Sequence, residues 1–107
     1  MMCHKNTRHL EKEKKRANIL ITAVGQSKLI KRKHVSRNQV VVDIGINIVR
    51  SNPTSPKLRG AKKIVGDVDF ENVKKAVKAI TPVPGGVGPM TVASLFQNLL
   101  GAYALQT

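Results

Sequence analysis

The segment "NILITAVG", residues 18–25, decides the fold class of this chain. It is a continuous aliphatic run that ends at a glycine, and "QVVVDIG", residues 39–45, has the same form. Runs without polar alternation are typical of parallel strands that are covered on both faces. A third short strand is predicted at residues 79–83.

Helical patterns alternate with these strands. Residues 7–16, "TRHLEKEKKR", have helix-forming composition, with Thr7 as the candidate N-cap. Residues 71–78 follow Asp69, a second candidate N-cap, and an apolar helix is predicted over residues 91–105. The alternation of helices and strands predicts an α/β fold with a parallel sheet.

Residues 48–65 form the least regular part of the sequence. They contain two prolines, two serines and five basic residues, so we predict a long surface loop. Asp67 and Asp69 lie close together just before a predicted helix, where a capping role is expected for them.

The charge is distributed unevenly. The formal net charge is +13, and every lysine and arginine lies between Lys5 and Lys78. This pattern fits a solvated basic face over a packed neutral C-terminal part, attraction to polyanions such as nucleic acid, or a site for a phosphorylated cofactor or a polycarboxylate substrate. The charge alone does not choose among these three interpretations.

Several classes of site and segment are excluded by the residues themselves. Cys3 is the one cysteine, so no intrachain disulfide and no cysteine-based zinc site can form. His4, His9 and His34 lack metal-ligand spacing and are expected to be solvated. No apolar run reaches the ~20 residues of a membrane-spanning helix, and the basic start shows no secretory signal.

Glycine follows each predicted strand, in "AVG" (residues 23–25), "DIGIN" (43–47) and "TPVPGGVG" (81–88). Ligands of parallel α/β sheets bind beyond the carboxyl ends of the strands, and glycine lets the backbone approach a ligand closely. These segments therefore predict a binding site built from backbone.

The segment "CHKNT", residues 3–7, bears on the choice of cofactor. In a dinucleotide-binding fold an acid at the end of the second strand favours the free ribose 2′-hydroxyl of NAD, whereas a basic residue accommodates a 2′-phosphate. Lys5 lies here with His4 and Thr7 and without an acid, so NADP is the expected cofactor and NAD the alternative.

With these motifs in order, the chain resembles the C-terminal part of bifunctional methylenetetrahydrofolate dehydrogenase/methenyltetrahydrofolate cyclohydrolase. "PGGVGPMTV", residues 84–92, is similar to a specific signature of that family, and "CHKNT", "ANILITAVG", "VVVDIGIN" and "GDVDF" occur in the family's order. The resemblance implies that residues 1–107 are part of a Rossmann-like NAD(P)-binding domain that lacks its N-terminal portion. Within it, residues 80–96 correspond to the folate and cofactor loop and the start of the C-terminal helix.

The resemblance also implies an activity and a set of site residues. The activity is NAD(P)-dependent oxidation of 5,10-methylenetetrahydrofolate, followed by hydrolysis to 10-formyltetrahydrofolate. The implied cofactor-binding residues are His4, Lys5, Thr7, Ala23, Val24, Gly25, Gly45, Ile46 and Thr91. The implied substrate-binding residues are Val83, Pro84, Gly85 and Gly86. No catalytic residue is assigned, because the family's catalytic Lys and Tyr belong to an N-terminal domain outside this chain.

Two alternatives stay open at this point. One is a non-catalytic relic, and the other is a basic nucleic-acid-binding protein, although the few aromatic residues are not interleaved with basic ones. For the enzyme, the resemblance implies a tetrahydrofolate derivative as substrate and a homodimer as the full-length form. It also implies a cytoplasmic or mitochondrial-matrix location, with no specific nucleic acid and no membrane as partner.

Overall fold

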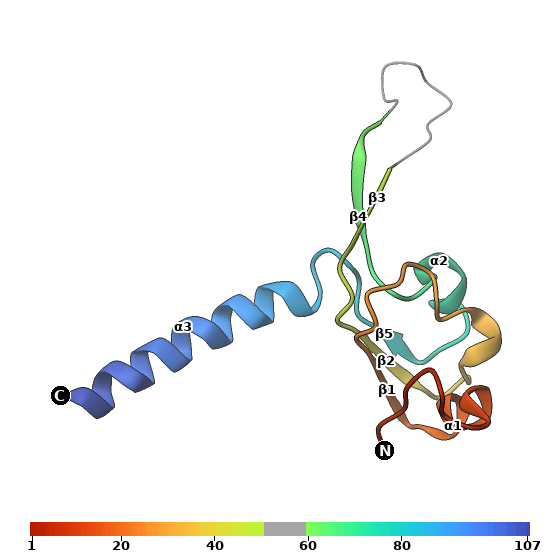
Figure 1. Ribbon diagram of the computed structural model, residues 1–107, viewed down its shortest axis with the longest axis horizontal. Coiled ribbons are helices and arrows are strands. Elements are labelled where there is room, and N and C mark those ends of the chain that lie inside the picture. Colours follow the sequence, from red (N-terminus) through yellow and green to blue (C-terminus); the bar gives the residue numbers. More distant parts are fainter. Residues whose placement is uncertain (51–59) are drawn as a thin grey trace.

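Three parallel strands form the centre of the computed structural model, which describes residues 1–50 and 60–107 (Figure 1). They are β1 (Ile19–Thr22), β2 (Val40–Asp43) and β5 (Ala79–Ile80), in the spatial order β1-β2-β5. The predicted α/β fold with a parallel sheet is confirmed. Each strand is shorter than its apolar run because the last residues of the run already belong to the loops at the carboxyl edge.

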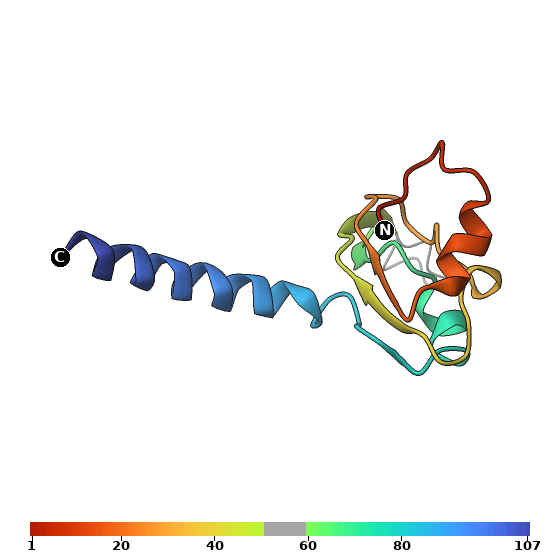
Figure 2. The same ribbon diagram turned by 90° about the horizontal axis from the view of Figure 1, so that it is seen from below.

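One face of this sheet carries the core. Leu20, Val41 and Ile80 lie side by side in register and face α1 (Leu10–Arg16), the 3-10 helix η1 (Arg32–His34) and α2 (Phe70–Val73), which lie on the same side of the sheet (Figure 2). The fully buried apolar residues are Ile30, Val35, Val41, Val68 and Val73, with Ala76 and Val77 packed against them.

The other face of the sheet is open in the described residues. Ile19 and Ile21 point away from the core and are each 61% exposed. The prediction that both faces of the strands are covered is therefore wrong for this part of the chain. The apolar pattern was read correctly, but the described residues place helices on only one face.

An antiparallel pair of strands occupies both ends of the predicted surface loop at residues 48–65. β3 (Asn47–Arg50) pairs in antiparallel fashion with β4 (Lys62–Val65), with Ile48 opposite Ile64. Such cross-strand apolar pairs stabilise a ribbon. The prolines and serines that suggested a loop fall within residues 51–59, which lie outside the described residues.

The last helix, α3 (Val87–Gln106), begins four residues earlier than predicted and extends away from the rest of the molecule (Figures 1 and 2). Every residue from Gly88 to Thr107 is exposed. The expectation of a packed neutral C-terminal part is therefore wrong. Among the helices described, none has both the length and the apolar character that crossing a membrane requires.

The helix ends differ in detail from the predictions. Thr7 does not cap α1, because His9 occupies the N-cap position and the Thr7 hydroxyl accepts the backbone N–H of His4 at 2.9 Å. Asp69 does occupy the N-cap position of α2, but its side chain makes no capping hydrogen bond there. Residues 74–78, predicted to continue this helix, form turns instead.

Candidate functional site

Two buried carboxylates organise the carboxyl edge of the sheet. The first is Asp43, the last residue of β2, which is 3% exposed. Its carboxylate accepts hydrogen bonds from four groups. These are the backbone N–H groups of Gly45 (2.9 Å), Asp67 (3.1 Å) and Val68 (3.0 Å), and the Thr22 hydroxyl (3.3 Å). Asp43 thus ties the ends of β1 and β2 to the segment that follows β4.

The second is Asp67, whose side chain reaches the loop after β1. Its carboxylate accepts the backbone N–H groups of Val24 (2.6 Å), Gly25 (3.1 Å) and Gln26 (3.0 Å), and the side-chain amide of Asn47 (2.9 Å). Burial alone would raise the pKa of Asp67, but these hydrogen bonds outweigh it and hold the pKa below its ordinary value. The expected capping role of Asp67 is wrong: it fixes a loop at the sheet edge instead.

Two glycines make room for these acids. A Cβ at Gly45 would overlap the carboxyl group of Asp67, and a Cβ at Gly66 would overlap the carboxyl group of Asp43. The contact of the Gly45 backbone with the cofactor stays a prediction, and the structure places this glycine against Asp67. Its neighbour Ile46 is 68% exposed at the same edge.

The segment after β5 joins this edge through its backbone. The Thr81 hydroxyl accepts the backbone N–H of Asp43 at 2.9 Å, which fixes the start of the loop. The loop then folds back sharply: a Cβ at Gly86 would overlap the carbonyl oxygen of Pro82, and the Val83–Pro84 peptide bond is cis. Gly85 has a φ of 98° and open space where a Cβ would lie, so its backbone faces outward.

A cleft of about 880 Å³ lies along the free edge of β1. Its lining includes His4 and Lys5 from the N-terminal segment, Ile19 and Thr22 from β1, and Val24 from the following loop. The turn that carries Lys5 is closed by two hydrogen bonds between His4 and Thr7, each 2.9 Å long. The cleft therefore runs from the basic N-terminal segment to the loop that follows β1.

These residues fit an extended, phosphorylated dinucleotide. Lys5 is exposed and supplies positive charge at one end. Gly25, which follows the cleft-lining Val24, has a φ of 71° and no neighbour within 4 Å of a Cβ position, so a flat group can approach its backbone. The structure thus brings His4, Lys5 and Val24 to one cleft and joins Gly25 to Gly45 through Asp67. Thr91 lies apart, on α3, where its hydroxyl donates to the Val87 carbonyl at 3.1 Å.

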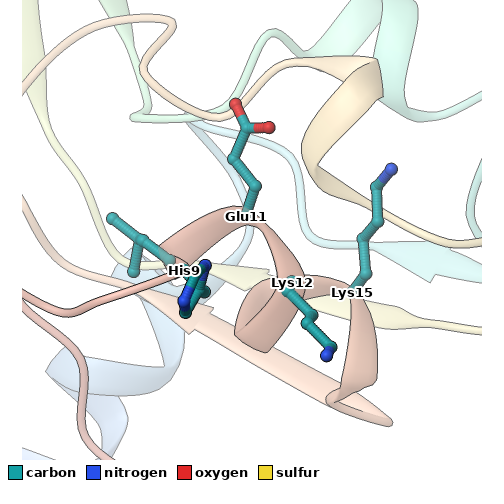
Figure 3. Close-up of a pocket in the computed structure, with 5 residues that line it drawn as sticks. His9, Glu11, Lys12 and Lys15 are labelled. Carbon is teal, nitrogen blue, oxygen red and sulfur yellow. The ribbon is translucent and has the colours of Figure 1, made fainter.

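A second, smaller depression of about 550 Å³ lies over α1 (Figure 3). Its lining residues all come from the start and the outer side of one helix: His9, Leu10, Glu11, Lys12 and Lys15. In Figure 3 the side chains of Glu11 and Lys15 extend to one side of α1, and those of His9 and Lys12 extend to the other. None of these residues belongs to the predicted site, and the depression is not a candidate for the chemistry.

The predicted histidine environments hold in part. Within residues 1–50 and 60–107, no group of three or more His, Cys, Asp or Glu side chains could hold a metal ion. His4 and His9 are exposed as expected, but His34 is 8% exposed and is not solvated. Its Nδ1 accepts the backbone N–H of Lys31 at 3.0 Å, and its Nε2 lies 3.2 Å from Glu11.

Sequence reasoning missed the acids and their partners at the edge of the sheet. Asp43, Asp67, Asn47 and Thr81 were not predicted as site residues, yet they hold the predicted glycine segments in place. No local pattern pointed to these acids, because each carboxyl group packs against the glycine beside the other acid: Gly45 lies against Asp67, and Gly66 lies against Asp43.

Comparison with known proteins accounts for this arrangement. The family model described as tetrahydrofolate dehydrogenase/cyclohydrolase, NAD(P)-binding domain, matches residues 1–107. The chain belongs to this family. A relative named bifunctional protein FolD, from Sulfurihydrogenibium sp., is 54% identical over 102 residues, which are 95% of this chain and 32% of the relative. Another protein of that name, from Mycoplasma mycoides, is 48% identical over 97% of this chain and 33% of its own length.

Solved structures of the family agree with the fold of this NAD(P)-binding domain. The bifunctional dehydrogenase/cyclohydrolase of Thermoplasma acidophilum matches 97% of this chain and 34% of its own, with a TM-score of 0.83 and 36% identity. The methylenetetrahydrofolate dehydrogenase of the silkworm Bombyx mori matches 99% of this chain and 33% of its own, with a TM-score of 0.80 and 44% identity. This family domain therefore spans about a third of the length of its relatives, and its match along the whole chain does not favour the nucleic-acid alternative.

Proposed function

We propose that this chain forms the cofactor-binding and folate-facing part of an NADP-dependent methylenetetrahydrofolate dehydrogenase that also has methenyltetrahydrofolate cyclohydrolase activity. In the first reaction 5,10-methylenetetrahydrofolate loses a hydride to NADP, and water then opens the methenyl product to give 10-formyltetrahydrofolate. The observation that carries the proposal is the cleft beside β1, which is lined by both Lys5 and Val24 in a chain of this family.

The preference for NADP rests on the chemistry of residues 3–7. His4 and Lys5 are exposed at the cleft, and no acidic residue occurs in this segment. A 2′-phosphate would gain a charge-assisted hydrogen bond from Lys5, whereas a ribose hydroxyl of NAD would gain little from it. In support, a related structure from Trypanosoma brucei, 36% identical, is described as a complex with NADP cofactor and inhibitor.

The substrate assignment rests on the loop of residues 83–86. The loop carries no charge, Pro84 and Gly85 are exposed, and the outward face of Gly85 is open. An uncharged, backbone-lined surface of this kind suits a flat polar heterocycle such as the pterin of a tetrahydrofolate derivative. We assign no catalytic residue to this chain, so it is expected to bind ligands alone without sustained turnover.

The remaining parts of the proposal concern the longer protein. By analogy with the family, the full-length protein is proposed to be a homodimer in the cytoplasm or the mitochondrial matrix. Analytical ultracentrifugation of the full-length protein tests the dimer. A monomer at micromolar concentration would contradict it.

The experiment that tests the function is a thermal-shift titration of the chain with NADP, NAD and a folate analogue. A ligand that binds only the folded state raises its unfolding temperature by mass action. We expect NADP to raise the unfolding temperature of the wild-type chain. Lys5→Glu should weaken the affinity for NADP by about tenfold, which is ~1.4 kcal/mol for one lost phosphate contact. The response to NAD should not weaken, because an acid at this position favours a free ribose 2′-hydroxyl.

Lys12→Glu is the matched control, because it makes the same change of charge on α1 outside the cleft. It should leave the response to NADP at the wild-type level. If both variants weaken the response to NADP equally, the cause is the change in net charge and not a contact of Lys5. If NADP does not shift the unfolding temperature at all, the proposed function is contradicted.

A further inference from the structure

The loop after β1 directs three consecutive backbone N–H groups at one point. The N–H groups of Val24, Gly25 and Gln26 all donate to the carboxylate of Asp67, at distances of 2.6 to 3.1 Å. A fourth donor, the side-chain amide of Asn47, approaches the same carboxylate from β3 at 2.9 Å. Asp67 itself is fully buried.

This arrangement is an amide nest. Successive backbone N–H groups that converge around a residue of left-handed conformation form a concavity that binds anions, and phosphate sites are often built in this way. Gly25, with a φ of 71°, supplies the left-handed residue. In this chain the concavity holds a carboxylate of the chain itself.

The occupant is firmly held. The backbone N–H of Asp67 donates to Asp43 at 3.1 Å, and its carbonyl accepts the N–H of Ile30 at 3.0 Å. The space beside its carboxyl group exists because residue 45 is a glycine. Four hydrogen bonds to the charged form also keep the pKa of Asp67 below its ordinary value, so the nest is occupied by an anion at neutral pH.

The occupied nest decides what the loop can offer to a ligand. Its three N–H groups are engaged by Asp67, so they are not available to a ligand, and the Val24 side chain is exposed beside them. A phosphate oxygen accepts hydrogen bonds and therefore finds no free backbone donor at residues 24–26. The negative charge of Asp67 also repels a phosphate that approaches this loop.

We propose that Asp67 is a specificity-determining residue: as the built-in occupant of the amide nest, it excludes phosphate from the loop at residues 24–26 and reserves this loop for an uncharged part of the cofactor. Phosphate is then left to the basic end of the cleft, at His4 and Lys5. The second half of this inference rests on the proposed cofactor function, whereas the occupied nest stands without it.

The first test uses the wild-type chain and inorganic pyrophosphate, followed by the amide signals in two-dimensional ¹H–¹⁵N spectra. The nest predicts no saturable shift at Val24, Gly25 or Gln26, while signals at His4 and Lys5 move. A saturable shift of the three nest amides by pyrophosphate would overturn the proposal, since it would show that the loop accepts phosphate in the presence of Asp67.

The second test deletes the carboxylate of Asp67 and then supplies a small carboxylate from solution. Asp67→Ala removes a group that matches formate, so formate should shift the three nest amides of this variant in a saturable way and raise its unfolding temperature. Asp69→Ala is the matched control, because it deletes a nearby carboxylate whose partner is the exposed Asn72 side chain. Neither the control nor the wild-type chain should respond to formate at these amides.

The test of the amide nest remains informative even if Asp67→Ala does not fold. If Asp67→Ala is unfolded in buffer, recovery of its cooperative transition in formate supports the nest. Failure of formate to shift or refold the variant, at concentrations that leave the wild-type chain unaffected, would overturn it. Both tests contain no NADP, so their outcome is separate from that of the NADP titration.

Discussion

The backbone N–H of Asp67 donates a 3.1 Å hydrogen bond to the carboxylate of Asp43, so one buried acid positions the other. Asp43 ends a strand of the sheet, and Asp67 reaches the loop that follows the neighbouring strand. The geometry of the whole carboxyl edge therefore depends on two side chains that a ligand on the open cleft need not touch.

Replacement of Asp43 tests this dependence. Asp43→Asn keeps the shape but turns one acceptor oxygen into a donor that faces backbone N–H groups. We expect a loss of about 3 kcal/mol in the free energy of unfolding, since buried donors are left without partners. Urea denaturation measures it. Asp69→Asn, at a half-buried position whose partner is the exposed Asn72 side chain, should change stability by less than about 0.5 kcal/mol. Equal losses for the two variants would contradict the assignment.

The glycine beside Asp67 should tolerate no side chain. A Cβ at Gly45 would overlap the Asp67 carboxyl group, so Gly45→Ala is expected to cost about 2 to 3 kcal/mol of stability through overpacking. Gly101→Ala provides the comparison, because it lies on α3 with open space around its Cβ position. That change should be neutral or stabilising by up to about 1 kcal/mol. Thermal unfolding distinguishes them, and a neutral Gly45→Ala would refute the close approach.

His34 should make stability depend on pH. Its Nδ1 accepts a backbone N–H, so the neutral ring carries its proton on Nε2 and donates to Glu11. Burial, followed by the charge of Lys14, lowers the pKa of His34; Lys33 acts in the same direction, and Glu11 opposes them without prevailing. The folded state therefore resists protonation of this ring.

The sign of the effect follows from that shift. The contribution of His34 is complete above the unfolded pKa of about 6.5 and is lost as the pH falls from there through the lower folded value. Urea midpoints measured across this interval should fall for the wild-type chain and fall less for His34→Gln. His4→Gln, at an exposed position, is the control and should follow the wild-type curve. A wild-type curve that rises on acidification would contradict the shift.

Gln39 should determine the stability of α1. It is 1% exposed, and its amide nitrogen donates to the carbonyl oxygens of Lys14 (2.6 Å) and Ala17 (2.8 Å) at the C-terminal end of that helix. Gln39→Glu replaces the donor by an acceptor of the same shape, and we expect a loss of about 2 to 3 kcal/mol with faster amide exchange in α1. Asn38→Asp makes the same chemical change at an exposed neighbour and should leave exchange in α1 unaltered.

The sequence predicted the parallel sheet because the signal for β1 and β2 is local: long aliphatic runs end at glycine. It did not predict β3 and β4, because basic segments such as "NIVR" and "KKIV" are recognised as strands only from their pairing with each other. The strand-end glycines were found for the same local reason. Asp67 was missed because its role depends on partners 20 to 43 positions away, a distance that no local pattern reports.

Because α3 extends away from the rest of the molecule, the chain is amphiphilic in the same way as a surfactant. All 19 lysine and arginine residues lie between Lys5 and Lys78, and the sequence from Ala79 onward has no charged side chain. A cationic head group is thus joined to an apolar tail whose leucine and phenylalanine side chains meet water. Repulsion between heads should limit the clustering of tails at low ionic strength, and screening by salt should promote it, so the particle size seen by light scattering is expected to rise with salt.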